Sequence, residues 1–520
     1  MGLPRCLSLR SGAVACAVLS AVIATTAVPG RARAVPAADA AAVERWIVVL
    51  KDSVADPGAV ANQHAQSEGK GRVRHVYNAA AGGNALKGYA LEATATQIQA
   101  IRADPRVASV ERDQKVSLPK PLKGAAPRAR RKLSGTPGSG GVRYAGDPLL
   151  AGQWGPFRIG TVGGADKGFT VPAPARVGVA ELDSGVDFNH PDLRVAGSVN
   201  FSDAPTADDL LGHGTHVAGI IQALNNGIGV EGTAPGTKLW NVKVLGDDGT
   251  ADFSDLVAGL DWVTRNAKAK NIRVANMSLT SPVSSPALHE AVRVATRAGV
   301  TVSAAAGNES TNQPQYPAAY PEAIGVAATT VFNQRADFSN YGATWVDIAA
   351  PGTDILSTGP THPNGFFLPE YAYLSGTSMA TPFASGTIAL CLTSGHCRGT
   401  TNDILATLGR DSLRISGTGT DYRYGLVQAA CYWQHIPKCH SITVGRGKVV
   451  SRKSLKARTQ PTSHSAEAGN LRPGQTITID CKAKGQWVKG NNIWYKLGQN
   501  PRGWAPARHI KNLNAIPYCT

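Results

Sequence analysis

The chain has 520 residues, of which 42% are hydrophobic and 17% are charged, and its net charge at pH 7 is +17. This length suggests about three or four folded units, and the composition is typical of globular proteins. Beyond the first 34 residues no stretch is apolar for long enough to span a membrane, which excludes a protein with several membrane spans.

The first 34 residues have the pattern of a secretory signal peptide. Arg5 and Arg10 precede an apolar run, residues 13–24, and small residues lead to Ala34. A membrane anchor is the alternative, but the apolar run is short for a span. We therefore expect cleavage after Ala34 and a secreted, extracellular protein without a membrane span.

The cysteine count agrees with an oxidising compartment. Of 8 cysteines, Cys6 and Cys16 lie in the predicted signal peptide, which leaves an even number, six (8 − 2). Proximity in the sequence suggests the pairs Cys391–Cys397, Cys431–Cys439 and Cys481–Cys519.

The region after the signal peptide shows an α+β pattern. Residues 45–53 are predicted to form a buried strand and residues 84–93 a pair of strands. Ala95, Ile98 and Ile101 have helical spacing.

Residues 119–143 are predicted to be a linker, because they are rich in Pro and Gly and contain 7 basic residues but no acidic ones. Such a segment is easily cut by proteases. We expect the mature N-terminus to lie between Pro119 and Tyr144.

Residues 144–439 alternate β-branched runs with helical segments. The predicted strands lie within residues 176–187, 239–246, 272–280, 300–308, 323–330 and 345–352. This alternation predicts an α/β domain with a mostly parallel sheet covered by helices on both faces. Reactive side chains of such domains gather at the carboxyl ends of the strands.

Four polar residues, Asp183, His213, Asn308 and Ser378, fall at element ends in this domain. Each alone is explained as a cap or turn residue. Together they match the parts of acyl-transfer chemistry, in which a serine attacks, a histidine accepts its proton and an aspartate orients the histidine. The Asn308 amide and the Ser378 N–H would bind the oxyanion.

The segments "DSG", "HGTHVAG", "AAGN" and "GTSMATP", in this order, resemble those of subtilisin-type serine proteases (subtilases, peptidase family S8). The resemblance extends from about residue 147 to residue 430 and implies a serine endopeptidase acting on proteins or peptides. It also implies that an extended substrate pairs as an added strand with Gly249, Thr250, Ser278 and Leu279.

Residues 45–117 resemble the inhibitor I9-type propeptide of subtilases. The resemblance implies a ferredoxin-like fold for residues 35–118, and a precursor inhibited by its own propeptide until the chain is cut.

The segments "HPDL" and "LNNGIGV" resemble a calcium site of subtilases. By this resemblance Asp192 and Asn226 give side-chain oxygens, while Leu224, Ile228 and Val230 give carbonyl oxygens, which suits Ca²⁺. Gln153 is a further candidate ligand. A loop that needs no ion is the alternative.

The chain departs from the family pattern at three places. Glu181 stands where an apolar residue is usual, two residues before Asp183 and so on the same face of the strand; if buried, its pKa would be raised. "PFASG" replaces "PHVAG", which changes helix packing. "SLTS" replaces "SLGG", so Thr280 and Ser281 are expected to narrow the substrate groove.

Residues 440–520 have the pattern of a small all-β domain and a charge balance of +12, from 14 Lys and Arg against Glu467 and Asp480. Segments such as "WYKL" and "RGWAPARHI" resemble bacterial SH3-like domains, which implies binding to peptidoglycan or peptides. The charge favours an anionic wall polymer, whereas no nucleic-acid motif is present.

The sequence therefore favours a secreted bacterial endopeptidase, monomeric and retained at the cell wall. A catalytically impaired subtilase scaffold acting as a wall-binding protein is the alternative.

Overall fold

The computed structural model describes residues 42–67, 71–81, 84–118, 147–162, 174–366, 368–433, 445–497 and 503–513. The predicted signal peptide and linker lie outside these residues, as do Cys439 and Cys519. The domain boundaries stay predictions. No helix of the described part is long and apolar enough to cross a membrane.

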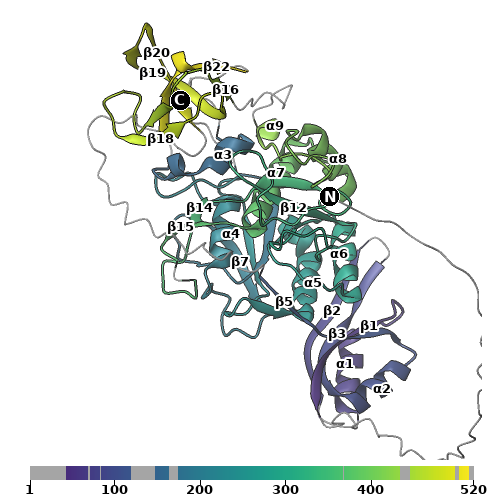
Figure 1. Ribbon diagram of the computed structural model, residues 1–520. Helices are drawn as coiled ribbons and strands as arrows, with labels where there is room; N and C mark the ends of the chain where they lie inside the picture. The colour runs from purple at the N-terminus through teal and green to yellow at the C-terminus, as the bar shows by residue number, and fades with distance from the viewer. Residues whose placement is uncertain are drawn as a thin grey trace, which may run out of the picture. The chain divides into compact units, whose positions relative to one another are not determined.

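The N-terminal region, residues 42–118, is an antiparallel sheet in the order β2-β3-β1-β4 with two helices (Figure 1). Its elements are β1 (Val43–Leu50), α1 (Pro57–Gln66), β2 (Arg72–Ala81), β3 (Asn84–Thr94), α2 (Ala95–Ala103), β4 (Val107–Arg112) and β5 (Lys115–Ser117). Thr94 and Gln97 form a capping box that starts α2.

The prediction of a strand pair within residues 84–93 is wrong, since these residues lie in the single strand β3. Gly88 lies within this strand, where it allows a close approach between β3 and β1. A Cβ at Gly88 would lie only 2.2 Å from the Val48 carbonyl oxygen of β1.

The central domain contains a seven-stranded parallel sheet in the order β13-β12-β11-β10-β6-β8-β7. Its strands are β6 (Gly178–Asp183), β7 (Val195–Asn200), β8 (Leu239–Lys243), β10 (Ile272–Met277), β11 (Thr301–Ala305), β12 (Ala323–Thr329) and β13 (Ile348–Pro351). Short strands outside the sheet are β9 (Thr250–Asp252), β14 (Ile355–Thr358) and β15 (Tyr371–Leu374). The predicted mostly parallel sheet is confirmed.

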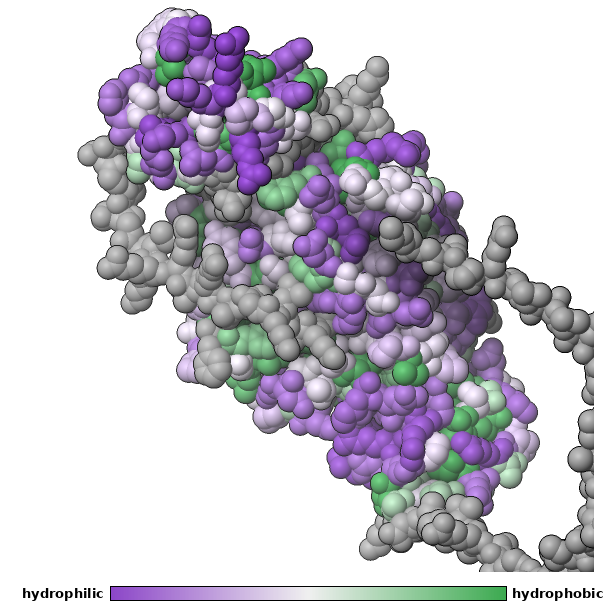
Figure 2. All heavy atoms as spheres, viewed as in Figure 1, coloured by the Kyte–Doolittle hydropathy of each residue, from purple (hydrophilic) through white to green (hydrophobic). Residues whose placement is uncertain are grey.

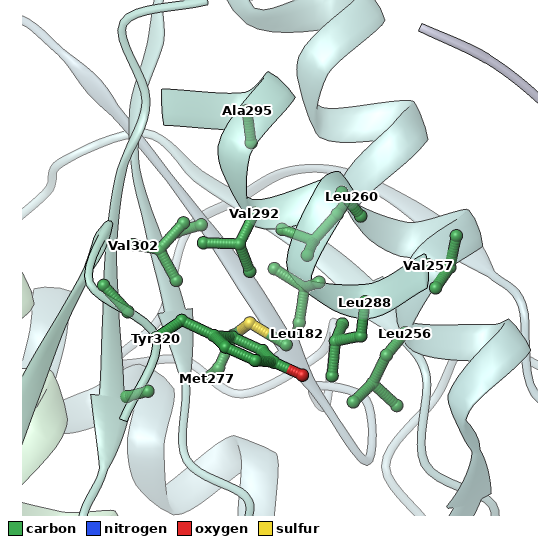
Figure 3. Packing of buried hydrophobic residues seen from close by; sticks show 14 of the residues in the cluster. Leu182, Leu256, Val257, Leu260, Met277, Leu288, Val292, Ala295, Val302 and Tyr320 are labelled. Atoms are coloured by element: carbon green, nitrogen blue, oxygen red, sulfur yellow. The ribbon is translucent and has the colours of Figure 1, made fainter. Parts of the chain in front are cut away.

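Helices cover both faces of this sheet (Figure 1). They are α3 (Trp154–Ile159), α4 (His213–Gln222), α5 (Phe253–Lys270), α6 (Pro286–Arg297), α7 (Thr377–Ser394), α8 (Thr401–Asp411) and α9 (Ala430–Trp433). Helices α5 and α6 pack on one face, where Leu182 and Met277 of the sheet meet Leu256, Leu288 and other apolar side chains (Figure 3). Helices α4 and α7 pack on the opposite face.

The structure contains the predicted disulfide Cys391–Cys397 at the end of α7. Cys431 is disulfide-bonded as well, and its predicted partner, Cys439, lies outside the described residues. The pairing Cys481–Cys519 stays a prediction.

The C-terminal β-domain, residues 445–513, has the sheet order β18-β17-β21-β20-β19-β16-β22. Its strands are β16 (Gly445–Val449), β17 (Leu455–Arg458), β18 (Glu467–Leu471), β19 (Thr476–Val488), β20 (Asn491–Leu497), β21 (Gly503–Pro506) and β22 (Ile510–Asn512). Trp494 is buried and donates to the Gln486 carbonyl, whereas Trp487 is 68% exposed. Hydrophilic side chains dominate the face of this domain seen in Figure 2.

Glu181 lies in β6, at the middle of the central domain, and is fully buried. Its neighbours in register are Asn241 of β8 and Asn276 of β10. Neither of its carboxyl oxygens has a hydrogen-bond partner among the described residues. Burial raises the pKa of Glu181 well above its usual range, and the carboxylates of Asp183 and Asp209 raise it further, which favours the protonated form of this side chain.

We expect Glu181→Leu to stabilise the chain by about 1–3 kcal/mol at neutral pH, because it removes a buried carboxyl without partners. In the unfolded chain Glu181 ionises near its ordinary pKa of 4.5. The folded chain keeps the proton, so the stability of the wild type falls as pH rises above that value. The advantage of the leucine variant should therefore grow with pH, and thermal unfolding between about pH 5 and pH 9 measures it.

Glu181→Gln is the matched control, since it keeps the size and polarity of the side chain but does not titrate. The stability of the glutamine variant should depend on pH as weakly as that of the leucine variant. If both variants keep the wild-type dependence, Glu181 does not hold a proton in the folded chain.

Candidate active site

Asp183, His213 and Ser378 all lie at the carboxyl edge of the parallel sheet. Asp183 ends β6, His213 is the first residue of α4 and Ser378 is the second residue of α7. The Asp183 Oδ1 atom lies 2.7 Å from His213 Nδ1. All three side chains are at most 5% exposed in the precursor.

The Ser378 hydroxyl donates to the Ser278 carbonyl oxygen at 3.1 Å, and the Ser278 hydroxyl donates to the Ser378 carbonyl oxygen at 2.9 Å. The structure thus joins Asp183 to His213 directly and holds Ser378 beside Ser278. Within the described part of the chain no hydrogen bond joins Ser378 to His213. Because Nδ1 of His213 faces the carboxylate, Nε2 is the nitrogen left for a serine proton.

Asn308 lies next to the start of α7. Its Oδ1 atom accepts hydrogen bonds from the backbone N–H and the hydroxyl of Thr377, both at 2.9 Å. These bonds orient the amide, so that Nδ2 faces the space above Gly376. A Cβ built on Gly376 would lie 3.3 Å from Asn308 Nδ2 and 3.6 Å from the Ser378 nitrogen. Two donors therefore border one small space, as an oxyanion hole requires.

Asp209 supports His213, and the sequence analysis missed it. Its Oδ2 atom accepts from the Thr215 N–H at 2.8 Å, and its Oδ1 atom accepts from the Gly212 N–H at 2.8 Å. These are backbone donors at the start of α4, so Asp209 caps the helix that carries His213. The sequence signal is an Asp just ahead of an apolar helical run, a pattern common at caps.

The end of the N-terminal region lies in the predicted substrate groove. Strand β5 pairs antiparallel with β9, with Ser117 opposite Thr250. The Leu118 N–H donates to the Gly249 carbonyl at 3.1 Å, and the Thr280 N–H reaches the Ser117 carbonyl at 3.5 Å.

Gly249 and Thr250 therefore contact an extended chain in the structure. On the opposite side of the groove Thr280, rather than the predicted Leu279, makes the backbone pair. The Leu279 side chain is fully buried in the core. The Ser281 hydroxyl accepts from the Val283 N–H at 3.1 Å, so it is engaged within its own loop.

The rest of the N-terminal region docks on helices α5 and α6. Glu111 accepts from the Ser285 hydroxyl and the Ala287 N–H at the start of α6. Asp113 accepts from the Ser254 N–H at the start of α5. Carboxylates at helix N-termini satisfy free N–H groups and match the helix dipole.

Basic residues of the N-terminal region also meet acidic residues of the central domain. Arg74 contacts Asp203 at 3.0 Å and Asp255 at 3.1 Å. Arg45 pairs with Asp252. Asp252 belongs to β9, whereas Asp203 and Asp255 lie outside the pairing of β5 with β9, so the ion pairs of Arg74 bind this region without occupying the position of a substrate.

The predicted calcium loop gathers buried carboxylates. Asp192 Oδ2 accepts from the Val230 N–H at 2.9 Å, while Oδ1 is buried without a partner among the described residues. Asp147 Oδ2 and both carboxyl oxygens of Glu231 are likewise buried without a hydrogen-bond partner among these residues. Burial, together with the neighbouring carboxylates, raises the pKa of Asp192 to about 7 and that of Glu231 to about 8.

Gln153 is not free to serve as a ligand. Its Oε1 atom accepts from the Glu231 N–H at 2.8 Å, and its Nε2 atom donates to the Glu231 carbonyl at 2.9 Å. Asp147, which the sequence analysis missed, instead reaches the loop, with Oδ1 accepting from the Gly227 N–H at 2.7 Å.

Asp187, Asp208 and His362 form a separate group of potential ligand side chains within the described ranges. Asp187 Oδ2 already accepts from the N–H and hydroxyl of Thr361, and His362 lies 3.3 Å from Asp208. These side chains therefore pair with one another and with the loop between β14 and β15.

Comparison with known proteins agrees with this arrangement. The model of the subtilase family matches residues 175–427, and that of peptidase inhibitor I9 matches residues 37–119. Subtilisin BL of Lederbergia lenta is 45% identical over 238 residues, which cover 46% of this chain and 82% of that protein.

Two further relatives are similar. Subtilisin of Bacillus pumilus is 43% identical over 259 residues, covering 48% of this chain and 88% of its own length. An alkaline protease of Alkalihalobacillus alcalophilus is 45% identical over 238 residues, which cover 46% of this chain and 58% of that protein. With the Asp183–His213 contact at the edge where Ser378 lies, these matches show that the chain belongs to the subtilase family and is a subtilisin-type serine endopeptidase.

Proposed function

We propose that the chain is the precursor of a secreted endopeptidase in which Asp183, His213 and Ser378 form the catalytic triad and Asn308 supplies an oxyanion donor. The observation that supports this best is the 2.7 Å contact between Asp183 and His213, beside the start of α7 that carries Ser378.

In the first step the Ser378 hydroxyl turns from the Ser278 carbonyl towards His213 and attacks the substrate carbonyl carbon. His213 accepts the hydroxyl proton at Nε2, and Asp183 stabilises the imidazolium through Nδ1. The negative oxygen enters the space above Gly376, between Asn308 Nδ2 and the Ser378 N–H. His213 then gives the proton to the leaving amine, and the acyl-enzyme forms.

Water then hydrolyses the acyl-enzyme through the same proton transfers. It loses a proton to His213 while attacking the acyl carbon, and Ser378 leaves with that proton. An extended peptide is held in place by backbone hydrogen bonds to Gly249 and Thr280, the positions that residues 117 and 118 contact in the precursor.

The N-terminal region acts as the inhibitor in this proposal. Its last described residues occupy the groove as an added strand, while Glu111, Asp113 and the Arg74 ion pairs hold its body on α5 and α6. A peptide substrate makes only the groove contacts, so the propeptide binds more tightly.

We further propose that calcium binds at the loop around Asp192. The residues fit a hard cation, because buried carboxylate oxygens of Asp147 and Asp192 have no hydrogen-bond partner within the described ranges and Glu231 adds a third carboxyl nearby. Calcium would supply charge compensation for Asp147, Asp192 and the carbonyl groups of the loop, and so would hold the loop together.

The C-terminal β-domain would retain the secreted protein at an anionic cell-wall polymer. Besides its positive charge, the domain has an exposed aromatic side chain that could contact such a polymer. This side chain is Trp487, which lies next to the Lys489–Gly490 turn. Arg508 donates to the Lys489 carbonyl, which brings a second cation to this turn. A flat ring beside cations suits a sugar polymer with phosphate groups.

Ser378→Ala tests the proposed nucleophile. Secreted wild type should react with a fluorophosphonate probe as a chain shortened by removal of the propeptide, and the variant should remain unlabelled. Ser375→Ala is the matched control, because the Ser375 hydroxyl accepts from the Asp354 N–H and has no part in the proposed triad, and this variant should label like wild type. A folded, shortened wild type without label would favour the impaired scaffold.

Asp147→Asn tests the calcium site. In a Ser378→Ala background, which prevents self-digestion, millimolar calcium should raise the melting temperature relative to EDTA, since ligand binding stabilises the folded state. Asp147→Asn should lose most of that rise, whereas Asp337→Asn, at an exposed position, should keep it. Equal melting temperatures with calcium and EDTA would refute the site.

Binding to isolated bacterial cell walls tests retention. The full-length Ser378→Ala chain should sediment with the walls at low salt and be released as salt increases. Trp487→Ala should bind more weakly than Val450→Ala, which alters another exposed apolar side chain of the domain. No retention at low salt would remove the wall-binding proposal and leave the protease assignment intact.

A further inference from the structure

We propose that Asn276 is a positioning residue for the nucleophile Ser378, that it acts through Ser278, and that Ser385 of α7 orients its amide. This inference rests on the proposed function of Ser378. It is drawn from a series of buried hydrogen bonds that begins at Ser303 and ends at the Ser378 carbonyl oxygen.

The first turn of α7 has a carbonyl group that the helix leaves without its usual partner. In a regular α-helix the Ser378 carbonyl would accept from the N–H of the residue four positions later. That residue is Pro382, which lies inside α7 and has no N–H. The Ser278 hydroxyl donates to this carbonyl at 2.9 Å instead. The backbone of the nucleophile therefore depends on a side chain that directly follows β10.

Asn276 fixes the direction in which the Ser278 hydroxyl points. A serine hydroxyl can rotate, and its oxygen accepts as well as donates. The Asn276 Nδ2 atom donates to Ser278 Oγ at 3.0 Å. This bond occupies an acceptor position of the oxygen and leaves its proton for the Ser378 carbonyl.

Ser385 in turn orients the Asn276 amide. The Ser385 hydroxyl donates to Asn276 Oδ1 at 2.8 Å, so Nδ2 is the end of the amide that faces Ser278. Because this bond uses the Ser385 proton, Ser303 is the donor in the 2.5 Å contact between the two serine hydroxyls. All the bonds then run in one direction, from Ser303 to the Ser378 carbonyl, and bonds in such a series strengthen one another.

These bonds start from a polar row in the middle of the parallel sheet. Asn276 and Ser303 are neighbours in register on β10 and β11. Glu181 of β6 and Asn241 of β8 continue the row on the other side of Asn276. The four side chains and that of Ser385 are at most 1% exposed, a depth at which a polar group costs stability unless it is hydrogen-bonded. Ser385 is also where "PFASG" has Ser in place of the Ala of "PHVAG", so this departure adds hydrogen bonds to the core.

The consequence concerns the chemical step and not the binding of substrate. Ser378 supplies the attacking oxygen and, through its N–H, an oxyanion donor, so a shift of its backbone displaces both at once. Gly249 and Thr280, which hold an extended peptide, lie outside this series of bonds, and so does the contact between Asp183 and His213. Loss of Asn276 should therefore lower kcat and leave KM and the titration of His213 unchanged.

The experiment compares mature wild type with Asn276→Ala, Ser385→Ala and Asn241→Ala on one peptide substrate over a range of pH. Asn276→Ala should lower kcat about 10-fold with KM within about 2-fold of wild type. The pH at which kcat/KM falls on the acid side, which reports the protonation of His213, should stay the same. Ser385→Ala should lower kcat by less, about 3-fold, because Asn276 itself remains.

Asn241→Ala is the matched control. Asn241 has the same side chain in the same row, and it is equally buried. Its Nδ2 atom donates to the Ala207 carbonyl at 2.8 Å, away from Ser378. This variant should lose stability like Asn276→Ala but keep the wild-type kcat.

An unchanged kcat in folded Asn276→Ala, or an equal loss of kcat in Asn241→Ala, would overturn the inference. Where Asn276→Ala does not fold, Ser385→Ala decides in its place, since it removes a single oxygen atom. Fluorophosphonate labelling of wild type measures Ser378 separately. A folded wild type that does not label contradicts the proposed function, whereas normal labelling with an undiminished kcat in the variants contradicts only this inference.

Discussion

The contact between Asp183 and His213 is the constraint on which the rest of the site depends. It joins the end of the central strand β6 to the first residue of α4, and both side chains are buried. A helix that starts at a buried place needs partners for its free N–H groups. Asp209 provides them through bonds to Gly212 and Thr215, so the histidine is fixed by the same carboxylate that satisfies its helix.

This arrangement concentrates acidic groups in the middle of the domain. Asp183, Asp209 and Glu181 lie close enough for the charges of the first two to raise the pKa of the third. Asp209 is compensated by hydrogen bonds, and Asp183 by the His213 ring. Glu181 has neither among the described residues, so its protonated form is favoured and its burial costs stability.

Sequence motifs singled out Asp183, His213, Asn308 and Ser378, and the structure brings Asp183 into contact with His213 and Asn308 into contact with Thr377, beside Ser378. The two-residue period of a strand likewise placed Glu181 beside Asp183. Other features depend on contacts between distant segments. Asp147 reaches the loop at Gly227, about eighty positions away, and Gln153 is engaged by the Glu231 backbone. No local pattern separates these two residues as candidate ligands, and the spacing within residues 84–93 does not reveal that Gly88 allows a close approach between strands.

In the proposed function the propeptide and the substrate bind the groove in the same way, so a physical reason is needed for why the propeptide stays and a product leaves. Their common contacts are backbone hydrogen bonds at Gly249 and Thr280, which hold any extended chain. The propeptide adds contacts outside the groove, such as Arg74 with Asp255 and Glu111 with the start of α6. Once the chain is cut, a product keeps only the groove bonds and dissociates, whereas the propeptide keeps a second attachment that raises the effective concentration of its end at the groove. On this proposal, release of activity requires the loss of the contacts on α5 and α6, because cleavage of the chain alone does not remove them.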